Sequence, residues 1–255
     1  MAFSRRRNKR KPRFTASAHA CQACAVVRYC RSYQSMGKYG ADMSYRVLVA
    51  DDHPLMRTAL RQTIAQALGD AEVPEAARFE QIGPAIERSE GIDLIVLDLH
   101  MPGMNGFIGL MMLRSEHPAI PVLVVSASED HATIQRAIDC GASGFVPKSA
   151  PNTEIGDAIR AVLDGEIWMP AIEEVVDSGD ALPAQRIAGM TPKELRVLAG
   201  IAEGKLNKQI AYEMNIAEKT VKAHVTTILR KLGVLSRTQA AVIASQLALA
   251  PPPVE

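Results

Sequence analysis

Between residues 45 and 165 the chain alternates short apolar runs with longer stretches of helical periodicity. Three of these runs, at residues 47–49, 94–97 and 122–125, are continuously apolar. Strands that are apolar on both faces are typical of parallel sheets covered by helices on either side. The pattern therefore predicts an α/β fold with a doubly wound parallel sheet built from five βα units. The expected strands cover residues 45–50, 73–77, 93–98, 120–126 and 144–147.

Helical periodicity fills the segments between these strands. We expect helices over residues 54–68, 106–117, 129–140 and 152–163. The segment 79–88 has the same position between strands, but Gly83-Pro84 interrupts its pattern. Proline inside a helix removes a backbone donor and clashes with the preceding turn. The second helix is therefore expected to be irregular.

Polar residues stand at the carboxyl ends of four of the expected strands. They are Asp51-Asp52, Asp98, Ser126 and Lys148. In an open parallel sheet these ends meet at one crevice, where ligands bind. Three close carboxylates repel one another and require a cation, and their oxygen atoms favour Mg²⁺. We therefore expect one site in which all five residues take part.

The chemistry of such a site follows from its residue types. A carboxylate beside Mg²⁺ can attack a phosphoryl donor and form an acyl phosphate. Asp98 is the candidate nucleophile. The ammonium of Lys148 and the hydroxyl of Ser126 would hold the oxygens of the transferred group.

Four segments carry a resemblance to response-regulator receiver domains, which extends over about residues 44–165. They are Val49-Ala50-Asp51-Asp52-His53-Pro54, Leu97-Asp98-Leu99-His100-Met101-Pro102-Gly103-Met104-Asn105-Gly106, Ser126-Ala127-Ser128 and Gly144-Phe145-Val146-Pro147-Lys148. The resemblance implies a flavodoxin-like (βα)5 domain.

The roles of individual residues follow from the same resemblance. Asp98 would be the phosphoacceptor. Asp51, Asp52 and Asp98 would bind Mg²⁺ together with the backbone carbonyl of His100. Ser126 and Phe145 would form the switch: the hydroxyl of Ser126 moves toward the phosphoryl group, and the aromatic ring of Phe145 turns inward.

Other phosphate chemistries fit the sequence less well. A phosphatase of the haloacid dehalogenase class requires a second Asp two residues after its nucleophile, but this chain has His100 there. Lys148-Ser149 lacks the glycines of a phosphate-binding loop, and no GxGxxG motif follows the first strand. An enzymatic function is therefore not expected.

The net charge of +1 conceals three segments of different sign. Residues 1–42 hold 10 Lys and Arg against 1 acid, residues 43–185 hold 9 against 22, and residues 186–255 hold 10 against 5. This asymmetry indicates an acidic module joined to a basic module that faces nucleic acid. Prolines and acidic residues without an apolar stripe indicate a linker at residues 166–189.

The region 190–250 reads as a small all-α domain. Thr191-Pro192-Lys193-Glu194 is a capping box with proline at the first helical position. Further helices are expected at residues 207–214, 218–232 and 236–249. In the third, an apolar stripe must face the core, so the opposite face carries basic and small residues. Such a pair of helices is typical of a helix-turn-helix whose second helix enters the major groove.

Three segments of this region resemble the LuxR-type helix-turn-helix domain: 190–194, 204–211 and 220–225. By that resemblance Lys222, Ala223 and Thr226 lie at base edges. Contacts to DNA phosphates would come from Lys208, Lys219, Thr220 and Lys231.

Residues 1–42 are basic and show no periodicity that predicts an element, so we expect them to be disordered. Several interpretations remain open. The segment could be a DNA-binding arm or a targeting segment, or it could hold a metal through His19, Cys21, Cys24 and Cys30. Alternatively, Met43 is the start of the translated chain, and the segment is not translated.

Together the two halves resemble two-component response regulators of the NarL/FixJ type. The resemblance implies that a histidine kinase phosphorylates Asp98, which releases or dimerises the DNA-binding domain. The expected partners are double-stranded DNA, the kinase and a second copy of the chain. Two alternatives are a phosphorylation-independent DNA-binding regulator and an aspartyl-phosphate hydrolase. Cysteine usage indicates a reducing, cytoplasmic compartment, and no apolar run is long enough for a membrane span.

Overall fold

The structure, a computed structural model, describes residues 44–170, 187 and 189–247. These residues fall within one compact unit of the chain, Ser44–Glu255. The expectations for residues 1–42, including the cysteine and histidine group, lie outside the described residues. Most of the expected linker lies outside them as well.

A parallel sheet forms the centre of the first domain. The strand order is β2-β1-β4-β5-β6, and β3 also pairs with β1. The doubly wound α/β fold predicted from the apolar runs is therefore confirmed. The strands are β1 (Tyr45–Ala50), β2 (Ala71–Glu72), β3 (Glu75–Ala76), β4 (Leu94–Leu97), β5 (Val122–Ser126) and β6 (Gly144–Pro147).

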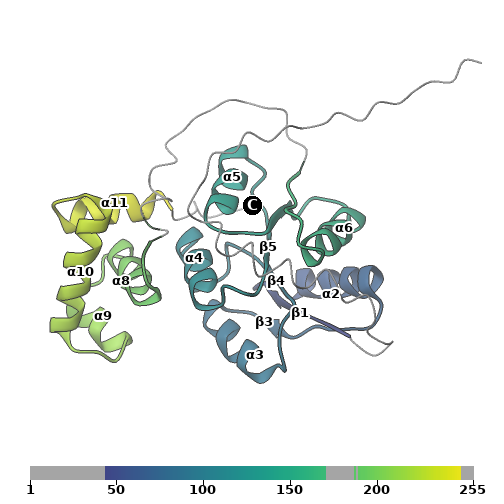
Figure 1. Cartoon of the computed structure of the whole chain (residues 1–255), viewed down its shortest axis with the longest axis horizontal. Helices are drawn as coiled ribbons and strands as arrows, with labels where there is room; N and C mark the ends of the chain where they lie inside the picture. Colours follow the sequence, from purple (N-terminus) through teal and green to yellow (C-terminus); the bar gives the residue numbers. More distant parts are fainter. Residues whose placement is uncertain (1–43, 171–186, 188, 248–255) are drawn as a thin grey trace, which may run out of the picture. The chain divides into compact units, whose positions relative to one another are not determined.

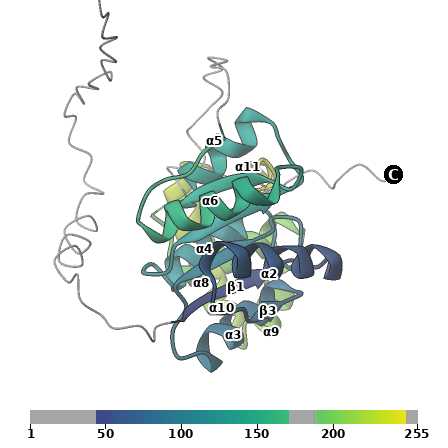
Figure 2. The same ribbon diagram turned by 90° about the vertical axis from the view of Figure 1, so that its right-hand side faces the viewer.

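Helices cover both faces of the sheet (Figure 1). One face packs against α2 (Pro54–Leu68) and α6 (Asn152–Leu163), which lie side by side in Figure 2. The other face packs against α3 (Ile82–Arg88), α4 (Phe107–Glu116) and α5 (His131–Asp139). Residues 47–50 of β1 alternate between the two layers and are all buried, which explains why the run 47–49 is apolar without interruption.

The second strand differs from its prediction. Residues 73–77 do not form one strand, because pairing with β1 is divided between β2 and β3. Pro74 stands between them and has no backbone N–H to donate. Its carbonyl still accepts a bond from the amide of Val49 at 2.9 Å, so the segment stays beside β1.

The irregularity expected around Gly83-Pro84 has a local explanation. A 3-10 turn at Phe79–Gln81 leads directly into α3, which begins at Ile82. Pro84 therefore lies in the first turn of a short helix, where its missing N–H breaks no intrahelical bond.

The second domain consists of α8 (Pro192–Ala202), α9 (Asn207–Glu213), α10 (Glu218–Leu232) and α11 (Arg237–Ser245). The capping box predicted for the first helix is present: Thr191 Oγ1 accepts from the amide of Glu194, and Glu194 Oε2 accepts from the amide of Thr191 at 2.8 Å. Between α9 and α10 the chain turns at Asn215, whose φ of 51° lies in the left-handed region that asparagine tolerates.

Candidate functional site

The strand ends bring the predicted polar residues to one edge of the sheet. Asp51 directly follows β1, Asp98 directly follows β4, Ser126 is the last residue of β5, and Lys148 directly follows β6. Asp51, Asp98 and Ser126 are buried. We call these residues, together with Asp52, the acidic edge. Regular parallel register places them there, because each strand stops at the same level of the sheet.

Lys148 joins two carboxylates of the acidic edge. Its Nζ lies 2.8 Å from Asp98 Oδ2 and 2.7 Å from Asp51 Oδ2. Burial alone would lower the pKa of Lys148, but the two acids outweigh burial and raise it. The ammonium is therefore charged at neutral pH. It stands beside an oxygen of the candidate nucleophile, where the oxygens of a transferred phosphoryl group would need a cation.

The other oxygen of Asp98 has different neighbours. Oδ1 accepts a bond from the backbone amide of His100 at 3.2 Å, and the His100 Nδ1 lies 3.8 Å from it. The same ring nitrogen is 3.4 Å from Ser126 Oγ. The Asp98 carboxylate is therefore held at both oxygens, and the predicted switch hydroxyl is linked to it through His100.

The acidic edge also has the donors of a cation site. Ligand atoms of Asp51, Asp52, His53 and Asp98 all lie within 4.8 Å of one another. Asp52 Oδ1 is buried and accepts no hydrogen bond in the described part of the chain, although His53 Nδ1 lies 2.6 Å away. Carboxylate oxygens gathered around one point are the ligands that Mg²⁺ prefers, so these residues fit that ion.

His53 was not among the site residues predicted from the sequence. Its ring contacts Asp52, and its backbone amide donates to Asp51 Oδ1 at 2.7 Å. The available signal was its position directly after the acid pair. That position alone could not show that the ring turns back toward the carboxylates.

Phe145 lies on β6, three residues before Lys148. Its side chain is fully buried and packs in the layer that contains α4 and α5. The backbone amide of Lys148 donates to the carbonyl of Ser126 at 2.7 Å. The two predicted switch residues therefore lie on hydrogen-bonded neighbouring strands.

In the second domain, α10 has one buried and one exposed side. Val221, Ile228 and Leu232 are fully buried against the other helices. Their burial leaves a set of side chains exposed on the opposite side, which we call the outward face of α10: Lys219, Thr220, Lys222, Ala223 and Thr226. Within the described residues, Lys219 and the exposed Lys208 of α9 form no ion pair, whereas Lys222 pairs with Glu218 at 2.9 Å.

Lys231 has a different environment from the other basic residues. Its Nζ lies 2.6 Å from Glu194 Oε2 and donates to the carbonyl of Gly189 at 2.8 Å. Burial alone would raise the pKa of Glu194, but the bonds from Lys231 and from the Thr191 backbone outweigh it and lower the pKa. A phosphate contact by Lys231 would require it to leave this buried acid.

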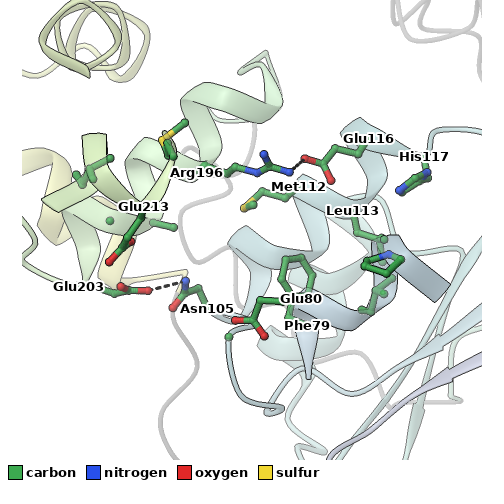
Figure 3. A pocket seen from close by; sticks show the side chains of 18 of the residues that line it. Phe79, Glu80, Asn105, Met112, Leu113, Glu116, His117, Arg196, Glu203 and Glu213 are labelled. Atoms are coloured by element: carbon green, nitrogen blue, oxygen red, sulfur yellow. Dashed lines mark hydrogen bonds and ion pairs between the residues drawn. The ribbon is translucent and has the colours of Figure 1, made fainter. Parts of the chain in front are cut away.

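Among the described residues, the hydrogen bonds and ion pairs between the two domains involve segments other than α10. Figure 3 shows Arg196 of α8 paired with Glu116 of α4, and Asn105 donating to Glu203. The amide of Phe107 donates to the carbonyl of Leu247 at 3.1 Å, which satisfies a free amide at the start of α4. These contacts leave the outward face of α10 exposed.

None of the described helices is both long enough and apolar enough to cross a membrane.

Comparison with known proteins gives matches to both domains. Residues 47–160 match the response regulator receiver domain, and residues 188–244 match the luxR family of bacterial regulatory proteins. The glycerol metabolism activator of Pseudomonas putida is 41% identical over 212 residues, covering 80% of this chain and 96% of that protein. The nitrate/nitrite response regulator protein NarL of Escherichia coli (strain K12) is 35% identical over 203 residues, covering 77% and 93%. A structure of the RcsB response regulator of Salmonella typhimurium has a TM-score of 0.47 at 22% identity, covering 80% and 100%.

Proposed function

The chain belongs to the two-component response regulators of the NarL/FixJ type, with a receiver domain and a LuxR-type DNA-binding domain, and on this premise we propose that Asp98 is its phosphoacceptor. The observation that carries the proposal is the position of Lys148 Nζ between Asp98 and Asp51. A buried carboxylate with an adjacent cation is prepared both to attack a phosphoryl group and to keep the product's oxygens neutralised.

The transfer joins an oxygen of Asp98 to phosphorus. The bond between phosphorus and the donor breaks at the same centre, and its electron pair leaves with the donor, which is the imidazole of a phosphorylated histidine in the kinase. Lys148 then binds an oxygen of the new phosphoryl group and the hydroxyl of Ser126 binds another. Phe145 follows because it lies on β6, and Lys148 is the residue directly after that strand.

Asp51, Asp52, Asp98 and the backbone carbonyl of His100 would hold Mg²⁺. The ion supplies positive charge to the phosphoryl oxygens when it is bound. The close grouping of ligand atoms from Asp51, Asp52 and Asp98, all within 4.8 Å of one another, supports this assignment. His53 contacts Oδ1 of Asp52. Its ring would have to move away when the ion binds, or become a ligand of the ion as well.

DNA would be bound through α10 in the major groove. The exposed Lys222, Ala223 and Thr226 reach base edges, while Lys208, Lys219 and Thr220 contact phosphates. Lys231 would contribute to phosphate binding only by leaving Glu194. Two copies bind one site as a homodimer, and exposed apolar side chains at Leu235 and Val242 support a contact near α11. We propose a cytoplasmic location, because a regulator must share the compartment of the DNA that it binds.

The domain limits that accord with this function are residues 44–165 for the receiver, 166–189 for the linker and 190–250 for the DNA-binding domain. Phosphorylation of Asp98 releases or dimerises the last of these. The protein itself is a regulator and not an enzyme, since its phosphoryl group is a signal that is held on Asp98. Its homologues are transcription regulators, which supports this assignment.

The direct test is the intact mass of the full-length chain after incubation with acetyl phosphate and Mg²⁺. We expect one phosphoryl addition, none without Mg²⁺ and none in Asp98→Asn. The matched control is Asp164→Asn, which changes an exposed acid at the end of α6 and leaves the addition intact. Addition to Asp98→Asn would disprove the assignment.

The same sample distinguishes the alternatives. Release of phosphate over many turnovers, faster than decay of a single acyl phosphate, would favour an aspartyl-phosphate hydrolase. Equal DNA affinity of the phosphorylated and unphosphorylated chain, measured on a site selected from a random duplex library, would favour a phosphorylation-independent regulator.

A further inference from the structure

The segment that follows α6 returns to the sheet and pairs with β6. Trp168 forms a parallel bridge with Gly144. The amide of Phe145 donates to the carbonyl of Trp168 at 3.0 Å, and the amide of Trp168 donates to the carbonyl of Ser143 at 3.2 Å. The edge of β6 is therefore covered by the first residues of the linker.

The side chains of this segment alternate as they do in a strand. Ile167 and Met169 are exposed, whereas the ring of Trp168 packs against the layer of α2 and α6. Gly144 provides the space for this approach: a Cβ at Gly144 would lie 3.1 Å from both the Cβ and the carbonyl oxygen of Trp168, and 3.0 Å from Cδ1 of Leu123 on β5. We call this pairing of Trp168 with residues 143–145 the Trp168 clamp.

Phe145 connects the clamp with the acidic edge. Its backbone amide makes one of the two clamp bonds, while its buried ring lies on the opposite face of the sheet in the layer of α4 and α5. Directly after the same short strand, Lys148 binds Asp98. A displacement of β6 caused by chemistry at Asp98 therefore acts directly on the clamp bond.

One feature of the closed Trp168 clamp is energetically unfavourable. Trp168 Nε1 is buried, and no acceptor for it exists among the described residues. A buried donor without an acceptor loses its hydrogen bond to water and disfavours the closed arrangement. Two backbone bonds at a sheet edge and the packing of the ring against the layer of α2 and α6 oppose this cost, so a small displacement of β6 suffices to shift the balance.

We propose that the Trp168 clamp is a two-state element that is closed in the unphosphorylated chain and opens when Asp98 is phosphorylated. Opening frees the first residues of the linker and so changes how the DNA-binding domain is tethered. This inference rests on the proposed function, because it takes phosphorylation of Asp98 as the input. Phosphorylation can shift the clamp only if its two states differ in their contacts with β6, and the Phe145 bond provides that difference.

Trp168 is the single tryptophan of the chain, so its fluorescence reports the clamp without a label. The experiment measures emission and acrylamide quenching of the full-length chain with acetyl phosphate and Mg²⁺, and the intact mass of the same sample. We expect a red shift and stronger quenching in the phosphorylated chain and neither in Asp98→Asn. Complete phosphorylation with unchanged emission would overturn the clamp alone. An unmodified mass would overturn the proposed function, and the clamp with it.

A pair of glycine variants tests the geometry. Gly144→Ala crowds Trp168, so we expect its emission to be red-shifted before phosphorylation and to change little afterwards. Gly83→Ala is the matched control, because nothing lies within 4 Å of a Cβ at that position. A Gly144→Ala response equal to that of the wild type would contradict the clamp.

Hydrogen exchange of the wild-type chain tests the clamp without any substitution. We expect the amides of Phe145 and Trp168 to exchange at least about tenfold faster after phosphorylation, since opening breaks both bonds. The amide of Ile95 in the central strand β4 should keep its rate. Unchanged or slower exchange at Phe145 and Trp168 would overturn the proposal.

Discussion

The acidic edge and the outward face of α10 use charged side chains in opposite ways. At the acidic edge Asp51 and Asp98 are buried, and both are paired with Lys148. On α10 the side chains of Lys219 and Lys222 are exposed, and among the described residues the latter pairs only with the exposed Glu218. Burial makes electrostatic interactions strong and fixes geometry, as phosphoryl chemistry requires, whereas exposure leaves a charge available to a large external partner.

Because of this difference, we expect substitutions in the two regions to affect folding stability and function differently. Substitutions at the acidic edge should change both stability and chemistry, because each group there compensates another. Substitutions on the outward face of α10 should change DNA binding and leave stability nearly unchanged.

The largest expected effect is that of Asp98→Asn on phosphorylation. The amide has no nucleophilic carboxylate, so we expect phosphoryl transfer from acetyl phosphate to fall below about 0.1% of the wild-type rate, a loss of more than about 4 kcal/mol in transition-state stabilisation. Phosphoprotein would be measured by mass over time. A residual rate near that of the wild type would show that Asp98 has a structural role only. The acidic edge would then not differ from the outward face of α10 in the way proposed.

Lys148→Met should have the next largest effect, and it should act on stability. It leaves Asp51 and Asp98 buried without their shared cation, so we expect the free energy of unfolding to fall by about 3 kcal/mol. Urea denaturation followed by circular dichroism measures the change. Added Mg²⁺ should restore part of the loss by supplying positive charge to the same carboxylates. Lys208→Met, an exposed control, should stay within about 0.5 kcal/mol of the wild type.

On the outward face of α10, Lys222→Ala and Lys219→Ala should differ from each other. Loss of a base contact by Lys222 should cost about 1–3 kcal/mol and relax specificity at one position of the selected site. Loss of a phosphate contact by Lys219 should weaken binding to all sequences alike and reduce the salt slope by about 1. Fluorescence anisotropy at several salt concentrations distinguishes them. If Lys222→Ala lowered the affinity for specific and random duplexes by the same factor, Lys222 would not contact a base.

The smallest expected effect concerns Glu194, a buried and paired acid within the DNA-binding domain. Because its pKa is lowered by folding, the pair with Lys231 stabilises the fold above the ordinary pKa of 4.5, and this contribution is lost as the pH falls below that value toward the folded pKa. Glu194→Gln should cost about 1–2 kcal/mol at pH 7, and the difference from the wild type should shrink below pH 4.5. Urea melts over a pH series would show it. A constant difference would mean that the charge is not involved.

The sheet and most helices of the structure follow from local patterns in the sequence. Runs such as residues 94–97 must be covered on both faces, and the parallel arrangement of the strands then brings their ends to one edge. The beginning of α8 was equally predictable, because its capping box is a short-range interaction between Thr191 and Glu194. The exposed side of α10 followed from the spacing of its apolar residues.

The failures lie where packing in three dimensions, and not a periodic pattern in the sequence, determines the outcome. The pairing of residues 71–76 depends on how Pro74 lies beside β1, and the turn of His53 toward Asp52 depends on how the chain enters α2. The return of Trp168 to β6 carried no periodic signal, since the pairing consists of a single residue.

The sequence by itself therefore determined the types of the elements, their order and the chemistry available at the strand ends, because side-chain periodicity and residue type are local properties. Only the tertiary structure decided which charges pair. It joined Lys148 to both Asp51 and Asp98, assigned Lys231 to Glu194, and placed Trp168 against the strand that carries Phe145. These contacts span long sequence separations, and their geometry depends on packing that no local pattern encodes.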